Sequence, residues 1–456
     1  MRKPLLVTTS LVLGLAIAAW AVYRPDQAIR VAAGVAAHHV CSMTYVGHQD
    51  PDTIYRELVT PMIGSLPAKW LTVHVDRERQ AVAVDGLVST LATATFTPGY
   101  GCRLDLPGNT AWVADTHVAP DIDDGFAAAG LVATDKPTVA AAMERVFAEH
   151  RGDAPKAVKA VVIVKDGKVV AERYAQGYGI RSKLISFSVA KSFTNALLGM
   201  LALDGKVDPK QPLGALEWQT PGDPRAAITI EDLMRMQSGL AAEEAESAFS
   251  PVAQMEFLHA DMAGFAAAQP AKEAPGKTFE YTSADTVLLD RMLGQRIGGG
   301  AAGVRAFARQ RLFAPLHMGD VTMEYDGQGT FIGSTYVYAT ARDYARLGLL
   351  YLNDGKAPDG SRLLPEGWVA WSRTSALGAP YGAGFWTNDG PSDVAQMRVE
   401  GGFPKDGFFA SGTMGQRIYI VPSEHLVITR FGYSAPPTYG IEDDVRLIKA
   451  AIAAYR

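Results

Sequence analysis

A serine and a lysine three residues apart could act as a nucleophile and its base. Ser188 and Lys191 lie in the stretch Phe187–Phe193, and the apolar residues that follow recur at helical spacing. Residues separated by three positions share one face of a helix, so the Lys191 amine could take the proton of the Ser188 hydroxyl. The pattern S-x-x-K also arises by chance, and Ser188 as a helix N-cap with a solvated Lys191 is the alternative interpretation.

The segments around this pair predict an α+β fold, in which helices flank an antiparallel sheet and a mainly helical insert interrupts it. A hairpin with Asp-Gly at its tip precedes Ser188, and two strands and a closing helix end the chain, so both ends build the sheet. The expected strands are 161–164, 168–171, 417–421 and 426–431. The expected helices are 139–150, 188–205, 230–236, 286–297, 303–312, 341–350 and 439–455.

The chain begins with an export signal. The basic pair Arg2-Lys3 precedes an uncharged run over 4–23, about the ~20 residues that cross a bilayer as a helix. The length of the run favours an uncleaved anchor, although Ala19-Trp20-Ala21 could also serve as a cleavage site. We therefore expect a protein anchored to the inner membrane by residues 4–23, with everything after Arg24 on the periplasmic side.

Residues 24–135 predict a small β-rich domain of unknown role, with a hairpin over 71–84, and residues 136–456 a separate domain that contains Ser188 and Lys191. Cys41 and Cys102 are the only cysteines, and an oxidising compartment favours a disulfide between them. Two unrelated buried thiols are the alternative. The histidines of this region show no metal-ligand spacing, so we expect no metal and no organic cofactor.

Charge and composition exclude some classes of function. The net charge is −5 and the chain has no block of like charges, so there is no electrostatic basis for binding nucleic acid. About half of the 456 residues are apolar, enough for a large core and two domains. A small-molecule substrate is compatible with this small net charge. The sequence leaves the oligomeric state open.

From about residue 136 to its end, the chain resembles the serine β-lactamase and penicillin-binding-protein superfamily. The resemblance rests on ordered segments, namely Ser188-Val189-Ala190-Lys191, the packing segment 233–240, Tyr281-Thr282-Ser283 after a Pro-Gly turn, 334–343, and 408–416. Within the superfamily it is most similar to the class C-like branch that includes 6-aminohexanoate-dimer hydrolases and esterases.

The resemblance implies roles for further residues. Tyr281 is implied as the third catalytic residue, a phenol that shuttles a proton between Ser188 and the leaving group. Ser283 and Tyr338 are implied as substrate-binding or supporting residues. The alternative for Tyr281, judged without the resemblance, is an ordinary half-buried aromatic. The second Tyr-x-Asn, at Tyr351, ends a helix before a turn and is expected to be structural.

The segment Ala410-Ser411-Gly412-Thr413 occupies the place of the superfamily's Lys-Thr-Gly. The resemblance implies that the Thr413 N–H shares an oxyanion hole with the Ser188 N–H, and that Ser411 and Gly412 lie beside the substrate. Ala410 replaces the lysine that helps to hold a substrate carboxylate in relatives, which argues against penicillins and peptidoglycan stems.

These features together predict a serine hydrolase that cleaves a carboxyl ester or a simple amide through an acyl-enzyme on Ser188. The alternatives are a β-lactamase or D,D-peptidase activity, or a membrane-anchored binding or sensor protein that has lost turnover. An α/β-hydrolase is strongly disfavoured, because the chain has no G-x-S-x-G and no alternating series of strands and helices.

Overall fold

The computed structural model describes residues 24–112, 126, 130–148, 156–319, 321–436 and 439–456. The expected anchor over 4–23 lies outside the described residues. Within the described ranges, no helix is both long enough and apolar enough to cross a membrane.

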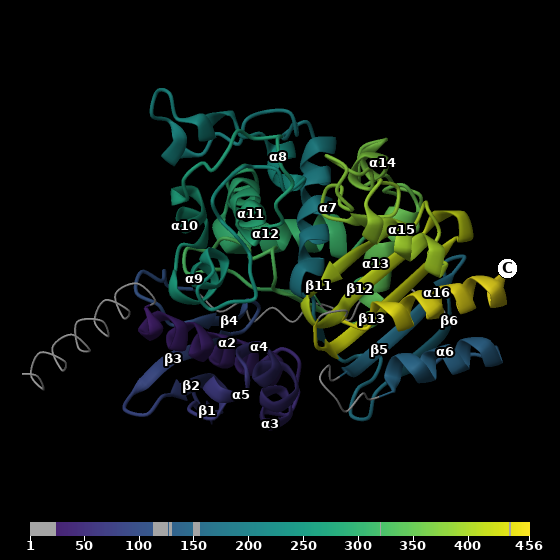
Figure 1. The fold of residues 1–456 in the computed structure, drawn as a ribbon, viewed down its shortest axis with the longest axis horizontal. Coiled ribbons are helices and arrows are strands. Elements are labelled where there is room, and N and C mark those ends of the chain that lie inside the picture. Colours follow the sequence, from purple (N-terminus) through teal and green to yellow (C-terminus); the bar gives the residue numbers. More distant parts are fainter. Residues whose placement is uncertain (1–23, 113–125, 127–129, 149–155, 320, 437–438) are drawn as a thin grey trace, which may run out of the picture.

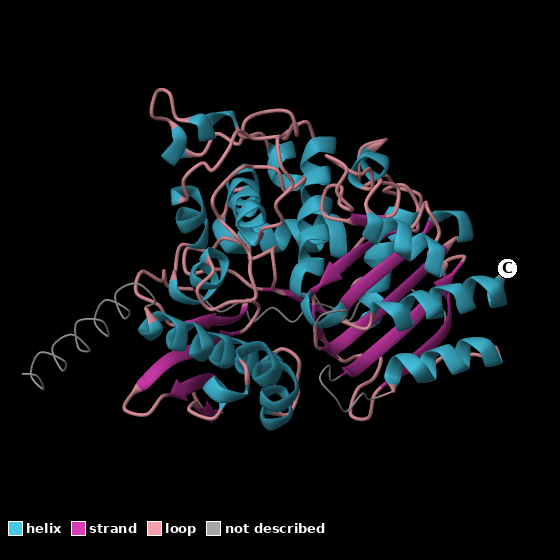
Figure 2. Cartoon of the chain, in the orientation of Figure 1, coloured by secondary structure: helices cyan, strands magenta, loops and turns pink. Residues whose placement is uncertain are grey.

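The described residues contain a central six-stranded antiparallel sheet with the order β10-β11-β12-β13-β5-β6 (Figures 1 and 2). Two of these strands come from the first part of residues 136–456 and four from the last part. This confirms the prediction that both ends of the domain build the sheet. The strands are β5 (Lys156–Lys165), β6 (Lys168–Tyr174), β10 (Trp386–Thr387), β11 (Phe408–Gly412), β12 (Gln416–Val421) and β13 (Leu426–Ser434).

The β5–β6 hairpin forms where the sequence predicts it. Asp166 and Gly167 both have positive φ, at 50° and 76°, as a tight two-residue turn between strands requires. Along β5, Val161 and Ile163 pack on one face of the sheet, while Val162 and its alternate neighbours pack on the other. Both faces are therefore buried, which explains why this strand is a continuous apolar run.

Helices cover both faces of the sheet. α6 (Pro137–Phe147) and α16 (Ile441–Tyr455) lie side by side on one face, and α13 (Ala341–Leu352) packs on the other against β12, β13 and β5 (Figures 1 and 2). These three helices confirm the predicted helices over 139–150, 341–350 and 439–455. The C-terminal segment also contains α14 (Trp368–Ser372), α15 (Asp393–Gly401), η6 (Thr413–Gly415) and η7 (Pro422–Glu424).

The predicted helical insert follows β6 in the chain, and of its helices α7 lies next to the sheet (Figure 1). Its elements are η2 (Phe187–Val189), α7 (Ala190–Leu203), η3 (Leu216–Trp218), η4 (Pro224–Ala227), α8 (Ile230–Met234), α9 (Pro251–Leu258), α10 (Met262–Ala268), α11 (Ser283–Ile297), α12 (Gly300–Ala308) and η5 (Arg309–Phe313). A short sheet, β7-β9-β8, closes one end of it, with strands β7 (Leu184–Ile185), β8 (Thr322–Met323) and β9 (Val337–Ala339).

The N-terminal unit combines a four-stranded antiparallel sheet with a long helix, α2, which the sequence did not predict. One side of α2 packs on the sheet and another on α9, where Gly34 lets Phe257 approach closely. A helix covered on several sides has no polar face and hence no amphipathic pattern to detect. The elements are α2 (Pro25–Tyr45), α3 (Pro51–Ile54), η1 (Tyr55–Val59), α4 (Thr60–Ile63), α5 (Ser65–Ala68), β1 (Thr72–Asp76), β2 (Ala81–Asp85), β3 (Thr90–Thr97) and β4 (Gly101–Leu104).

A disulfide joins Cys41 of α2 to Cys102 of β4, the pairing that the sequence favours. The preceding residue, Gly101, has φ of 78°, and a Cβ there would clash with the carboxylate of Glu324. The close approach of this carboxylate to β4 therefore requires glycine.

Glu324 connects the N-terminal unit to the rest of the molecule from a fully buried position. Its Oε1 accepts hydrogen bonds from the Ser42 hydroxyl and the Cys102 N–H, both at 2.7 Å. Its Oε2 lies 3.0 Å from Nε2 of His38 and accepts a hydrogen bond from the Tyr338 hydroxyl at 3.1 Å. One carboxylate thus satisfies donors on α2, β4 and β9.

We expect Glu324→Ala to lower the free energy of unfolding by roughly 3–5 kcal/mol, because it leaves several buried donors without an acceptor. Urea denaturation measures this change. Glu144→Ala is the matched control: Glu144 pairs with Arg173 but is 70% exposed, so its loss should cost less than ~1 kcal/mol. Equal stabilities of the two variants would contradict this role of Glu324.

Candidate active site

Ser188 lies in the short 3₁₀ turn η2, directly before α7. The preceding residue, Phe187, has φ of 43°, a left-handed conformation that is strained for an aromatic residue. Its buried ring stacks on the imidazole of His39 from α2, with 5.6 Å between centroids. The strained turn leaves the Ser188 side chain partly exposed at the start of an otherwise buried helix.

The Lys191 amine reaches Ser188, as the spacing predicts. Its Nζ donates hydrogen bonds to Oγ of Ser188 at 3.2 Å, to Oγ of Ser283 at 2.9 Å, and to the carbonyl oxygen of Ser334 at 3.0 Å. Lys191 is only 3% exposed. Burial lowers the pKa of the Lys191 amine, and nearby carboxylates, led by Glu244, act against this shift.

Tyr281 lies beside the amine, and its ring centroid is 4.9 Å from Nζ of Lys191. Burial raises the pKa of the Tyr281 phenol well above its ordinary value, Glu244 adds to the shift, and a hydrogen bond with Ser188 opposes it. The phenol is therefore protonated at neutral pH. The sequence interpretation allowed phenolate character, and these surroundings disfavour it.

Two carboxylates near the amine were not identified from the sequence. Glu244 accepts a hydrogen bond from the backbone N–H of Ser283, at the start of α11. Glu256, on α9, accepts one from the Thr335 hydroxyl at 2.8 Å. Burial, followed by the charge of Glu244, raises the pKa of Glu256 to about 7. The acidic run 243–246 was the available signal for Glu244.

Gly412 packs directly against the nucleophile turn. A Cβ on Gly412 would lie 2.5 Å from the carbonyl oxygen of Ser186 and 3.0 Å from the backbone nitrogen of Ser188. The next residue, Thr413, lines the same cavity as Ser188. Buried Arg430 holds the turn after it by donating to the carbonyl oxygens of Met414 and Gly415, at 3.2 and 2.5 Å.

We expect Gly412→Val to lower kcat/KM at least ~100-fold, because the side chain would push β11 away from the Ser188 N–H. The change is measured on an activated ester, with circular dichroism as the test of folding. Gly179→Val is the matched control: like Gly412, Gly179 does not have positive φ, but a Cβ there meets no atom within 4 Å. A Gly412→Val enzyme as active as the control would contradict the predicted position of the oxyanion hole.

Ser188 lies at one end of a cavity of about 740 Å³. The same cavity is lined by Tyr281, Ser283 and Thr413, together with Glu244 and other residues. The predicted catalytic residues, from segments far apart in the chain, therefore converge on one hollow, with Lys191 directly behind it.

Three other residues singled out in the sequence lie elsewhere. Tyr338 is fully buried and bonds Glu324, so of its two implied roles the structure leaves only the supporting one. Ser411 does not line the cavity. Tyr351 donates to the side-chain oxygen of Asn195 at 2.6 Å and fastens α13 to α7, the structural role expected of it.

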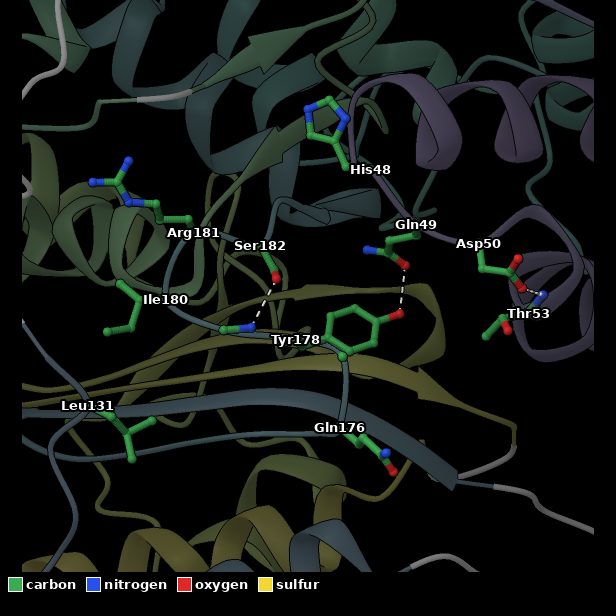
Figure 3. A pocket seen from close by; sticks show the side chains of 13 residues that line it. His48, Gln49, Asp50, Thr53, Leu131, Gln176, Tyr178, Ile180, Arg181 and Ser182 are labelled. Carbon is green, nitrogen blue, oxygen red and sulfur yellow. Dashed lines mark hydrogen bonds between the residues drawn. The ribbon is translucent and has the colours of Figure 1, made fainter. Parts of the chain in front are cut away.

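A second cavity, of about 810 Å³, lies between the start of α3 and the segment 176–182 (Figure 3). Figure 3 shows the Tyr178 hydroxyl directed at the Gln49 side chain, with a hydrogen bond of 2.6 Å. Asp50 caps α3 by accepting from the Thr53 N–H. Although this cavity is slightly larger, neither Ser188 nor Tyr281 lines it, so we assign the active site to the first.

Comparisons with known proteins concern the part of the chain that contains this site. Residues 138–452 match the family model for beta-lactamases. The 6-aminohexanoate-dimer hydrolase of Paenarthrobacter ureafaciens is 28% identical over an alignment of 228 residues, and the match covers 46% of this chain and 55% of that protein. The chain thus spans about half the length of this curated relative.

Solved structures show the same fold. A candidate 6-aminohexanoate-dimer hydrolase from Bacillus anthracis gives a TM-score of 0.55 at 22% identity, covering 73% of this chain and 90% of its own. A class C beta-lactamase from Rhodobacter sphaeroides gives 0.51 at 18% identity, covering 69% and 98%. At these identities the likeness concerns the fold alone.

The fold and the match to the family model together define the class of this protein. It is a hydrolase of the serine β-lactamase type, with an antiparallel sheet and a helical insert. The chain belongs to the beta-lactamase family, whose model covers more than half of it.

Proposed function

We propose that the protein is a serine hydrolase that cleaves a carboxyl ester or a simple amide through an acyl-enzyme on Ser188. The observation that carries this proposal is the buried Lys191 amine, 3.2 Å from the Ser188 hydroxyl and beside the Tyr281 ring. An amine whose pKa is lowered by burial is a competent base, and a protonated phenol is a competent acid.

The reaction has two steps. Lys191 takes the proton of Ser188 as Oγ attacks the carbonyl carbon, and the backbone N–H groups of Ser188 and Thr413 stabilise the oxyanion. The leaving alcohol or amine takes a proton from Tyr281, which recovers one from the Lys191 ammonium. Water then attacks the acyl-enzyme by the same route in reverse and frees the acid.

The charges around the cavity support an ester or simple amide over a β-lactam. Its lining includes Glu244, Glu246 and Glu256, and no lysine or arginine is among the described residues that line it. A carboxylate next to the scissile bond, as in penicillins and D-alanyl peptides, would meet repulsion and find no cation. Ala410, in place of the usual lysine, agrees with this preference.

A panel of substrates tests the proposal on protein purified without residues 1–23. We expect hydrolysis of nitrophenyl butanoate or of the 6-aminohexanoate dimer, with kcat/KM at least tenfold higher than for a chromogenic cephalosporin or a D-alanyl peptide. Activity restricted to the cephalosporin would overturn the substrate assignment. A protein inactive on the whole panel, and unlabelled by a fluorophosphonate, would be a binding protein instead.

We also propose that the protein is exported and anchored to the inner membrane by residues 4–23, with the active site on the periplasmic side. The uncharged run after Arg2-Lys3 and the Cys41–Cys102 disulfide support this location. Alkaline extraction of membranes from expressing cells tests the anchor. Release of the full-length chain into the soluble fraction would contradict it.

A further inference from the structure

The cavity that starts at Ser188 continues far beyond the space that the reacting bond needs. It follows one face of α2, from Pro25 to His39. At ~1.5 Å per helical residue this face is roughly 20 Å long. The α2 residues that line it, mostly small and apolar, are Pro25, Ala28, Ile29, Val31, Ala32, Val35 and His39.

The other walls of this extension are mostly apolar, although the loop before α9 also contributes Glu246, Ser247 and Ser250. One comes from α4, α5 and the residues next to them, with Met62, Leu66 and Trp70. The other comes from α9 and the loop before it, with Phe249 and Phe257. Leu66, Trp70 and Phe249 are more than half exposed, so they give the cavity an apolar rim.

Two carboxylates of the cavity, Glu244 and Glu256, lie at its catalytic end. Glu244 and Glu256 act electrostatically on Lys191, so they lie near the nucleophile. His39 packs on Phe187, its Nδ1 donates to the carbonyl oxygen of Val35 at 2.8 Å, and burial lowers its pKa to about 3. This imidazole is neutral at physiological pH, so the α2 wall carries no charge.

We propose that this extension binds a long aliphatic acyl chain, so that the substrate is a lipophilic ester or amide whose carbonyl reaches Ser188. The inference rests on the proposed function and names its substrate class. Burying each additional methylene group strengthens binding about fourfold. A peptide fits poorly, because its buried amides would find few side-chain donors on the walls of α2, α4 and α5.

The N-terminal unit thereby acquires a role in selecting the substrate. Residues of α2, α4 and α5 supply the apolar side of the cavity, and the Glu324 network and the packing of α2 on α9 hold this side in place. A hydrolase domain without this unit would have a shorter and more open site.

The test compares nitrophenyl acetate and nitrophenyl decanoate, the latter kept below its critical micelle concentration. We expect kcat/KM to be at least tenfold higher for decanoate. Ala32→Phe fills the extension and should lower the decanoate-to-acetate ratio at least tenfold. This ratio is taken on one sample, so it does not depend on the fraction of variant that folds.

Gln27→Phe is the matched control, because it adds the same ring on α2 at a position that does not line the cavity. Its ratio should stay within twofold of the parent's. A flat chain-length profile, or equal ratios in the Ala32→Phe and Gln27→Phe variants, would overturn the inference while leaving the hydrolase function intact.

A second readout needs no turnover. The Ser188→Ala protein is titrated with a dansyl-labelled decanamide and with the matching acetamide, and dansyl fluorescence reports binding. We expect the decanamide to bind at least tenfold more tightly, and Ala32→Phe to remove this advantage. If the decanamide binds tightly but the parent protein has no esterase activity, the acyl site is supported and the proposed function is overturned. Equal affinities would overturn the acyl site.

Discussion

Ser188→Ala is expected to lower kcat/KM for ester hydrolysis by roughly 10⁴-fold or more. The reason is that the hydroxyl is the atom that attacks, and the oxyanion hole alone supports only residual catalysis. Stopped-flow or long-time assays of nitrophenyl butanoate measure the loss. The stability of the variant should remain within ~1 kcal/mol of the parent, since this side chain is partly exposed.

Ser182→Ala is the control for this substitution. Ser182 accepts a hydrogen bond from the Gly179 N–H in the second cavity (Figure 3), away from the nucleophile. Its removal should change kcat/KM less than twofold. Retention of parental activity by Ser188→Ala would remove the basis of the mechanism.

Lys191→Met is expected to lower kcat/KM by roughly 10³-fold or more, because it deletes the base and keeps a side chain of similar length. The structural cost should be modest, since methionine fills irregular buried space well. The same ester assay measures the loss. Lys206→Met serves as the matched control, because Lys206 is exposed after the end of α7.

The pH dependence of the parent follows from the same amine. Catalysis requires neutral Lys191, so kcat/KM rises as the pH passes upward through its pKa. Since burial lowers the pKa of Lys191, the midpoint of this rise should lie below the ordinary lysine value of ~10.4. If kcat/KM falls at low pH in the same way in Lys191→Met, a group other than Lys191 causes this fall.

The sequence predicted those parts that local chemistry determines. The Asp166-Gly167 turn, the continuous apolar strands and the three-residue spacing of Ser188 and Lys191 are all local patterns, and the structure agrees with the predictions made from them. Tyr281 is different, because nothing near it in the chain marks it as special. Its assignment came from the resemblance, and the structure brings it to Lys191.

The remaining features depend on tertiary packing and left little local signal. Helix α2 is buried on several sides, so its small apolar residues show no periodic polar face. Glu256 gains its raised pKa only when α9 covers it and Glu244 comes near. The cavity itself is built by segments more than 200 positions apart in the chain, including Ala32 and Tyr281.

Labelling with a fluorophosphonate tests directly whether Ser188 is a nucleophile that Lys191 activates. The native protein is labelled, and its tryptic peptides are then identified by mass spectrometry. We expect one adduct, on Ser188, and labelling at least ~100-fold slower in Lys191→Met. An adduct on another residue, or equal labelling rates in parent and Lys191→Met, would contradict this expectation.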